Sequence, residues 1–253
     1  MNAIGLIAAT ADELRMFARR LPPPGTPRQL NEHLWIVRSG IGADAATAAA
    51  ERLLDAAGAL ALISWGTAGA LAPDLAAGDL LLPHRVIRAD DSFATDARWR
   101  AQVQSMVEGH CRIRTGDLLH SPAVVTTVQA KRTLRTTHPA IAVDMESAAL
   151  AARARQHGLP FLVVRAIADP ADGHIPPAVS AAIDGNGQLS GMRLLAGLCR
   201  HPGELPGLRA LARDFAAARR TLAPLAAQAL AGHLAPPAHA AAPAPGIAQA
   251  ESC

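Results

Sequence analysis

Three acidic residues, Glu13, Glu146 and Asp169, supply the chemistry that this sequence offers most clearly. Each lies beside a short apolar stretch with the pattern of a buried strand. Breaking a bond between a base and a sugar needs such a set, because the sugar becomes positively charged in the transition state. One carboxylate can offset that charge and hold sugar hydroxyls, while another protonates the departing base.

Each of these carboxylates also has a structural explanation when it is considered alone. Glu146 opens a predicted helix, where it could accept free backbone N–H groups, and Asp144 could do the same. Asp169 precedes a proline and suits a turn. Glu13 lies in the first turn of a predicted helix, where acidic residues are common. Their shared position beside strand ends favours a common site.

The elements that must position these residues alternate between apolar strands and alanine-rich helices. Strands that lack polar alternation are covered on both faces, which is typical of three-layer folds. We therefore expect an α/β protein with α/β/α layers around a central mixed, mostly parallel twisted sheet, and extra C-terminal helices. The predicted strands are 3–8, 33–38, 60–64, 79–87, 113–118, 141–143 and 161–167, and the predicted helices are 11–20, 43–57, 99–107, 146–156 and 205–225.

Ligands in open α/β sheets bind at the carboxyl ends of the strands. Four segments occupy such ends in this sequence, and we expect them to converge. They are the predicted glycine turn Gly66-Thr67-Ala68-Gly69, then Gly116-Asp117-Leu118-Leu119, Asp144-Met145-Glu146, and Asp169-Pro170.

The domain organisation follows from a change of composition along the chain. Residues 1–232 are predicted to form a single domain, with a helical C-terminal part at about 188–232. Residues 233–253 are rich in proline and alanine and have no apolar period, which predicts a disordered tail.

Composition excludes several classes of protein. The 253 residues carry 24 basic and 21 acidic side chains, a net charge of +3, without a basic run or interleaved aromatics, which argues against nucleic-acid binding. The three cysteines lie far apart without zinc-ligand spacing, so no metal site is predicted. We expect a cytoplasmic protein, because the first strand has no basic region before it and no apolar run could span a bilayer.

Six short motifs, in this order, resemble the nucleoside phosphorylase/nucleosidase superfamily, which includes the methylthioadenosine and S-adenosylhomocysteine nucleosidases. The resemblance covers roughly residues 3–172 and implies a phosphorylase/hydrolase-like fold. The motifs are Ile4-Gly5-Leu6-Ile7-Ala8-Ala9 with Asp12-Glu13, Ser39-Gly40-Ile41-Gly42, Gly66-Thr67-Ala68-Gly69, Thr115-Gly116-Asp117, Val143-Asp144-Met145-Glu146-Ser147-Ala148-Ala149 and Val164-Arg165-Ala166-Ile167-Ala168-Asp169.

The resemblance implies a role for each matching residue. Glu146 would hold the ribose 2′- and 3′-hydroxyls, with Met145 beneath the sugar. Asp169 would protonate N7 of the base, or hydrogen-bond to it as it leaves. Leu119 would pack on the adenine, and the main chain of His120 would flank it.

The same resemblance places the attacking group beside the glycine-containing segment. Thr67, Ala68 and Gly69 would line the pocket of the nucleophile, and Glu13 matches a water-activating glutamate of the nucleosidases. The chain also departs from the family pattern. Ala168 replaces a serine before the N7 acid, Leu119 replaces an aromatic residue that stacks on the base, and Ser64 replaces a phosphate-binding arginine of some phosphorylases.

Within this superfamily the chain most resembles the hopanoid-biosynthesis-associated phosphorylases. The resemblance rests on residues 63–71, 164–173, 202–206 and 209–214. It implies that adenosylhopane loses its adenine to leave ribosylhopane or phosphoribosylhopane. Residues 205–225 form a basic amphipathic helix that suits peripheral contact with the inner face of a membrane. Alternatively, this helix packs its leucine face on the core.

The attacking group can be water or phosphate. Glu13 favours water, because a carboxylate repels phosphate but can deprotonate water, and the absence of an arginine at position 64 agrees. Arg15 and Arg38 could instead bind phosphate, together with Gly42 and Thr67. The resemblance to the hopanoid branch favours phosphorolysis, with phosphate as co-substrate and no other cofactor.

Three further readings remain open. The chain could be a methylthioadenosine/S-adenosylhomocysteine nucleosidase. It could also bind nucleosides without catalysis, although it has no G-x-G-x-x-G motif, or serve as a scaffold in a membrane pathway, which would not need three carboxylates. The family resemblance also implies a homo-oligomer.

Overall fold

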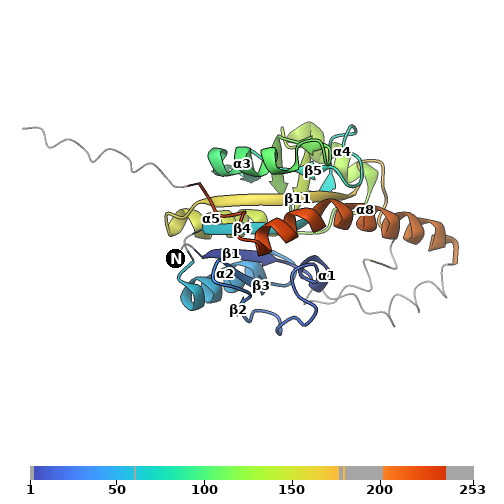
Figure 1. Ribbon diagram of the computed structural model, residues 1–253. Helices are drawn as coiled ribbons and strands as arrows, with labels where there is room; N and C mark the ends of the chain where they lie inside the picture. Colours follow the sequence, from blue (N-terminus) through green and yellow to red (C-terminus); the bar gives the residue numbers. More distant parts are fainter. Residues whose placement is uncertain (1–2, 60, 177–178, 180–201, 238–253) are drawn as a thin grey trace, which may run out of the picture.

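The structure is a computed structural model that describes residues 3–59, 61–176, 179 and 202–237 (Figure 1). Its described strands form one 11-stranded sheet. The strands are β1 (Ile4–Ala8), β2 (Arg28–Gln29), β3 (Leu34–Arg38), β4 (Ala61–Ala70), β5 (Leu80–Leu81), β6 (Arg85–Arg88), β7 (Asp91–Ala94), β8 (Ile113–Arg114), β9 (Asp117–His120), β10 (Ala142–Asp144) and β11 (Phe161–Asp169).

The helices largely follow the capping signals of the sequence. Gly58 ends the second helix with φ 52°, in the left-handed region that glycine tolerates best. Asp96 and Thr127 cap two other helices through their side chains. The helices are α1 (Ala11–Leu14), α2 (Ala43–Ala57), α3 (Ala97–Val107), α4 (Val128–Thr137), α5 (Ser147–Gln156), the 3₁₀ turn η1 (Pro202–Glu204) and α8 (Leu205–Leu230).

The sheet is mixed and mostly parallel, as predicted. Strand β1 pairs in parallel with β3 and β4, and β4 pairs in parallel with β11. Strand β9 lies parallel to both β6 and β10. Antiparallel pairs join β4 to β10 and β5 to β11.

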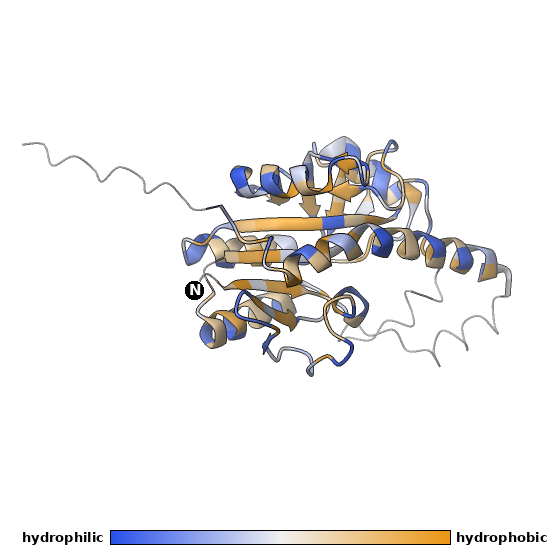
Figure 2. Ribbon diagram, in the orientation of Figure 1, coloured by the Kyte–Doolittle hydropathy of each residue, from blue (hydrophilic) through white to orange (hydrophobic). Residues whose placement is uncertain are grey.

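Helices cover both faces of the sheet, which gives the predicted three layers. Helices α1, α3 and α8 share one apolar core with the strands, and α2 and α5 share the other. Along β11, Leu162 and Val164 belong to the first core, whereas Val163 and Ile167 belong to the second. Figure 2 accordingly shows the central strands as mainly hydrophobic.

The first helix is much shorter than the predicted 11–20. It ends at Leu14, after a capping box in which Thr10 and Glu13 satisfy each other's backbone N–H groups. Leu14 and Phe17 are both buried, and Phe17 packs edge-on against Trp65 at 5.1 Å between ring centroids. Tertiary packing therefore turns the chain where helix propensity alone would continue it.

Two predicted strands are each divided into two. The stretch 79–87 is interrupted before β6 by Pro83, which lacks the N–H that a central strand needs. The stretch 113–118 is interrupted at Gly116, where a Cβ would lie 2.7 Å from the Ile141 side chain. At residues 66–69 the structure has more strand than predicted, because β4 continues through the predicted glycine turn.

The C-terminal helix is longer than predicted, and its two halves differ in burial. Leu222 and Leu225 are fully buried against the first core, so this half packs on the sheet. Leu205 and Phe215 are 42% and 43% exposed, and this half of α8 extends past the ends of the strands in Figure 1. Leu234, inside the predicted tail, is buried, whereas residues 188–201 and 238–253 lie outside the described residues.

Candidate active site

Three of the four predicted strand ends, at Gly69, Asp144 and Asp169, meet at one end of the sheet. The fourth segment, 116–119, differs, because Asp117 begins β9 and the carboxyl end of that strand is His120. Gly69 pairs with Val143 on one side and with Asp169 on the other. Asp144 pairs with His120 on the neighbouring strand. The segments that carry Glu146 and Asp169 are therefore brought together by β4, which lies between β10 and β11.

The Glu146 carboxylate is buried and does not cap its helix. It occupies the position before α5 but makes no side-chain capping bond, and its Oε1 accepts from the Gly42 amide at 2.8 Å. The Asp144 carboxylate accepts from the Ser147 amide instead, at 3.3 Å. Asp144 thus takes the capping role and leaves Glu146 available.

The pKa of Glu146 is raised to about 7, and burial is the main cause. The negative charge of Asp144 contributes to this rise, while the cation of Arg165 and the Gly42 amide oppose it. Glu13 adds a smaller repulsion. Glu146 is therefore an acidic group held where burial and a neighbouring carboxylate make ionisation costly, a common property of active sites.

Arg165 is the buried cation at the centre of these carboxylates. Its Nη2 donates to Asp144 Oδ2 at 2.7 Å, to Ser64 Oγ at 2.8 Å and to Ser147 Oγ at 3.1 Å. Its Nη1 is buried and has no hydrogen-bond partner within the described part of the chain. The sequence motif contains Arg165, but the motif by itself does not predict a role for this residue.

Glu13 has both carboxylate oxygens engaged. Its Oε2 accepts from the Thr10 amide at 3.0 Å, and its Oε1 accepts from the Thr67 amide at 2.9 Å and hydroxyl at 3.2 Å. A Cβ on Gly66 would lie 2.4 Å from Glu13 Oε1 and 3.0 Å from Arg165 Nη1. The Arg165 Nη1 and the Glu13 carboxylate therefore lie on the same side of Gly66, close to where its Cβ would be.

Asp169 ends β11 at an irregularity of the sheet. Ile167 pairs with Ala68 and Asp169 with Gly69, so Ala168 is the extra residue of a β-bulge, a feature that can redirect a side chain beside a site. The Asp169 Oδ1 accepts from Lys131 Nζ at 2.6 Å. Burial raises the pKa of Asp169, and Lys131 opposes that rise.

The residues predicted to hold the base and sugar lie beside these carboxylates in the chain. Leu119 is buried in a small cluster with Leu71, Ala140 and Val143. His120 Nδ1 is buried without a partner among the described residues, and burial lowers the pKa of this imidazole. Met145 is half-buried next to Glu146.

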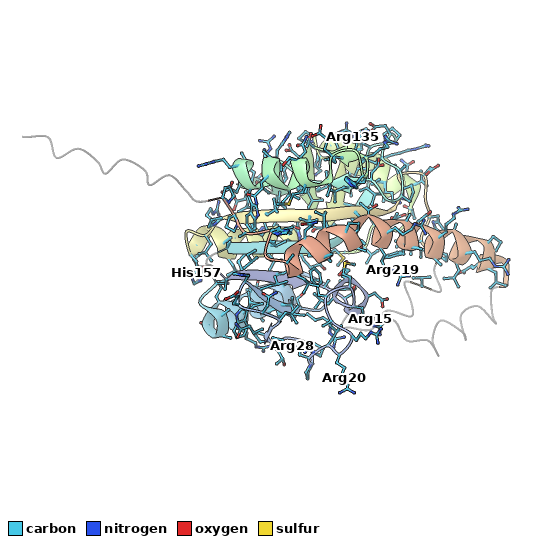
Figure 3. All side chains as sticks on the ribbon, in the orientation of Figure 1. Arg15, Arg20, Arg28, Arg135, His157 and Arg219 are labelled. Atoms are coloured by element: carbon cyan, nitrogen blue, oxygen red, sulfur yellow. The ribbon has the colours of Figure 1, made fainter. Side chains whose placement is uncertain are left out.

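Most of the predicted phosphate-binding groups already have other partners. The Gly42 amide and both donors of Thr67 already serve carboxylates. Arg15 is exposed and pairs with Asp12 at the surface (Figure 3). Arg38 ends β3, and its buried Nε has no partner among the described residues, so it alone of these candidates keeps a free buried donor.

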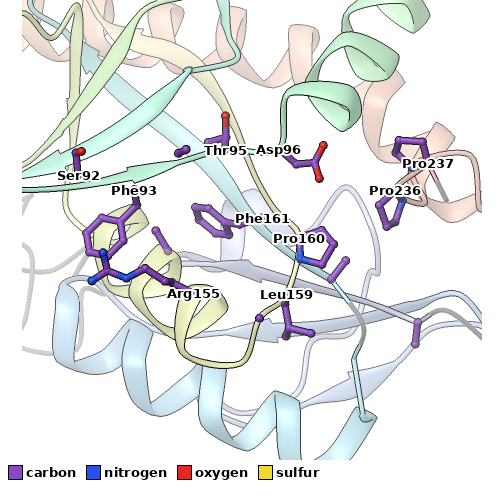
Figure 4. Close-up of a pocket in the computed structure, with 15 residues that line it drawn as sticks. Ser92, Phe93, Thr95, Asp96, Arg155, Leu159, Pro160, Phe161, Pro236 and Pro237 are labelled. Atoms are coloured by element: carbon purple, nitrogen blue, oxygen red, sulfur yellow. The ribbon is translucent and has the colours of Figure 1, made fainter. Parts of the chain in front are cut away.

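Two cavities lie at opposite ends of the sheet. One of about 330 Å³ lies beside Asp169 and His174 and is walled by Gly207 and Leu211 of α8. A larger one, of about 690 Å³, lies where β4 and β11 begin, at Ala61 and Phe161 (Figure 4). The larger cavity contains none of the three carboxylates, and ligands of such sheets bind at carboxyl ends, so we assign the site to the Asp169 end.

Comparison with known proteins shows the family of this chain. The family model described as "Phosphorylase superfamily" matches residues 3–199. A 5′-methylthioadenosine/S-adenosylhomocysteine nucleosidase of Shewanella pealeana is 25% identical over 223 residues, covering 76% of this chain and 97% of the relative.

Solved structures share the fold. A 5′-methylthioadenosine/S-adenosylhomocysteine nucleosidase of Helicobacter pylori, bound to butyl-thio-DADMe-Immucillin-A, superposes with a TM-score of 0.65 at 20% identity, covering 90% of this chain and 99% of that one. A futalosine hydrolase mutant from the same organism gives a TM-score of 0.63 at 21% identity, with 79% and 100% covered. From the fold, the converging strand ends and the match over most of its length, this chain belongs to the phosphorylase superfamily and is an enzyme of the kind that cleaves N-ribosyl bonds.

Proposed function

We propose that this enzyme hydrolyses adenine nucleosides of the 5′-methylthioadenosine and S-adenosylhomocysteine class and releases free adenine. The observation that carries the proposal is that Glu13 Oε1 and Arg165 Nη1 lie on the same side of Gly66, and that this Nη1 has no partner among the described residues. A carboxylate and a free N–H donor side by side suit a water molecule, which can donate to one and accept from the other. The curated nucleosidase relatives support the same substrate class.

The proposed reaction assigns one step to each carboxylate. Glu13 takes a proton from water as its oxygen attacks the anomeric carbon. The bond to the base breaks with its electron pair on the base, and Asp169 gives a proton to N7 of the leaving purine. Glu146 holds the ribose hydroxyls, and its negative charge offsets the developing oxocarbenium ion, with Met145 beneath the sugar.

Water is favoured over phosphate by the electrostatics around Gly66. A phosphate there would approach the Glu13 carboxylate, and Gly42 and Thr67 have no free donor for it. Ser64 lies buried in the Arg165 network, so position 64 offers no cation either. We therefore prefer hydrolysis to the phosphorolysis that the hopanoid branch implies.

The test is adenine release from methylthioadenosine and from S-adenosylhomocysteine in phosphate-free buffer, followed by chromatography. We expect equal rates with and without added phosphate, a free reducing ribose product, and little activity in Asp169→Asn. Release that depends on phosphate would overturn hydrolysis. No release from either nucleoside, while another adenosine derivative is cleaved, would overturn the substrate class.

A second candidate substrate, adenosylhopane, is favoured by one observation. The half of α8 that extends past the strands leaves Leu205 and Phe215 exposed, with exposed arginines at positions 209 and 213 on the same helix. Such a surface suits peripheral contact with anionic lipid. None of the helices in the described ranges is long and apolar enough to cross a bilayer, so we propose contact only.

Two measurements separate the candidates. A higher kcat/KM for adenosylhopane in vesicles than for methylthioadenosine would favour the lipid substrate. Flotation with anionic vesicles should then be lost in the double variant Leu205→Ser, Phe215→Ser. This variant keeps Leu222, which is buried in the core. If both proteins float equally, or neither does, membrane contact through α8 is excluded. The implied homo-oligomer is tested by light scattering of both proteins without vesicles.

A further inference from the structure

Lys131 is a buried lysine whose ammonium group is fully hydrogen-bonded. It is the one buried residue of α4, and its Nζ donates to Asp169 Oδ1 at 2.6 Å, to the Pro170 carbonyl at 2.7 Å and to the Gly173 carbonyl at 3.0 Å. An ammonium group has three hydrogens, so all of them have acceptors. Burying this charge is costly unless the partners repay it.

The two oxygens of Asp169 have different surroundings. Oδ1 is closed in by Lys131 and by Gly173, where a Cβ would come within 2.8 Å of it. Oδ2 lies on the side of Gly69, 3.4 Å from where a Cβ on that glycine would be. Gly69 pairs with Val143, which leads into Asp144 and Glu146. Oδ2 is therefore the oxygen on the side of the candidate site.

We propose that Lys131 is a positioning residue that commits Asp169 Oδ1 to its ammonium group, so that the transferable proton is carried on Oδ2. The inference rests on the proposed function, in which Asp169 protonates the leaving base. An oxygen that accepts from an ammonium donor at 2.6 Å has little room for a proton of its own.

Lys131 also offsets charge during the reaction. When the proton leaves Oδ2 for the purine, Asp169 becomes a buried carboxylate, and the unchanged ammonium ion lies beside it. The other charged groups facing Asp169 are His174, on the segment after β11, and Asp214 of α8, which act in opposite directions. Lys131 is the nearest of these to the carboxyl group, so its removal should dominate.

The same lysine fixes the segment that follows β11. The Gly173 amide donates to the Pro170 carbonyl at 2.9 Å, which closes a turn, and Lys131 contacts both residues of that hydrogen bond. A purely structural lysine would stabilise this turn without affecting proton transfer. The experiment must therefore separate the two roles.

The first variant is Lys131→Met, which removes the charge. If this apolar variant does not fold, Lys131→Gln replaces it, because glutamine removes the charge but keeps a hydrogen-bond donor. We expect kcat to fall roughly 10- to 100-fold, part of the effect that general acid catalysis supplies. The alkaline limb of the pH profile should move to higher pH, because the pKa of Asp169 rises without the cation. Arg132→Met, which removes an exposed cation from the same helix, should leave both unchanged.

A double-mutant cycle decides whether Lys131 acts through Asp169. In an Asp169→Asn background, Lys131→Gln should cause no further loss of adenine release. Equal losses in both backgrounds, with an unmoved pH profile, would overturn the proposal. Carboxyl NMR titration of Asp169 in Lys131→Gln gives a readout independent of turnover. If wild-type protein releases no adenine, the proposed function fails, and an upward-shifted titration would still support the Lys131–Asp169 pairing.

Discussion

Glu146 lies in a place where a charge is unfavourable to the fold. The residue is 9% exposed and close to the negative charge of Asp144, and burial is the main reason that its pKa rises to about 7. The proposed role needs the ionised form, because a carboxylate accepts hydroxyl hydrogens and offsets positive charge. Activity and stability therefore make opposite demands on this residue.

Glu146→Gln should remove activity and stabilise the fold at neutral to alkaline pH. An unfolded glutamate titrates near 4.5 and the folded one near 7, so folding takes up a proton between these pH values. The penalty of the charged form is absent below pH 4.5, grows as pH rises and is complete above 7. Glutamine avoids this penalty of about 3 kcal/mol.

Thermal unfolding from pH 4 to pH 8.5 measures this effect. The variant should melt roughly 6–12 °C higher than the wild type at pH 8, with the gain vanishing near pH 4. Its kcat should fall at least about 100-fold. A melting temperature at pH 8 that is lower for the variant than for the wild type would show that Glu146 stabilises the fold.

At this scale the sequence predicts acidic residues better than their partners. The place of Glu146 and Asp169 after buried strands was sufficient to select them. Lys131 was missed because it lies on a mainly polar helix, where its pattern matches an exposed lysine. Gly42 and Thr67 were expected to face phosphate, but their donors serve Glu146 and Glu13, a pairing that arises only when distant segments meet.

At the scale of elements, the Asp144–Arg165 pair joins three of them. Asp144 ends β10 and caps α5, while Arg165 lies in the middle of β11. The two side chains are 2% and 3% exposed, and Arg165 donates to Asp144 Oδ2 through both Nε and Nη2. The pair therefore sets how α5, the helix that Glu146 precedes, lies against the strand carrying Asp169.

Asp144→Asn should destabilise the protein by about 3–5 kcal/mol, because it removes the buried carboxylate to which Arg165 donates. Asp91→Asn is the matched control, since Asp91 forms an arginine pair with Arg155 at the exposed surface. The control should leave chemical denaturation midpoints unchanged. Similar midpoints for both variants would mean that the buried pair adds no more than the exposed one.

Element boundaries were predictable where local chemistry sets them. Gly58 ends α2 as its sequence signal indicates. The boundaries that were wrong depend on neighbours: β4 continues through 66–69 because strands on both sides of that segment supply hydrogen-bond partners. Pro83 is a local signal for the break between β5 and β6, but the apolar run around it predicts a continuous strand.

At the scale of the whole molecule, the C-terminal helix connects segments from both halves of the sheet. Thr221 of α8 donates to the Gly78 carbonyl at 2.6 Å, and Asn31, which precedes β3, donates to the Leu230 carbonyl at 2.8 Å. Beyond the helix, Trp99 of α3 donates to the Leu234 carbonyl at 2.8 Å. The layered fold was predictable from apolar strands, but this closure was not, because the segment from 233 has the composition of a tail.

Two shortened chains test how much this closure contributes. One ends at Pro237 and the other at Gly232, so their difference isolates residues 233–237. That segment carries Leu234, which is fully buried, and the carbonyls of His233 and Ala235 that accept from Gln102.

Losing the leucine contact should cost about 2–3 kcal/mol, or roughly 5–10 °C in melting temperature. Calorimetry of the two proteins measures this difference in melting temperature directly. Adenine release at 25 °C should persist in both proteins, because the segment contacts α3 and not the carboxyl ends of the strands. Coincident melting curves would mean that Leu234 contributes nothing to the fold, and loss of activity in the shorter chain alone would extend the candidate site to α3.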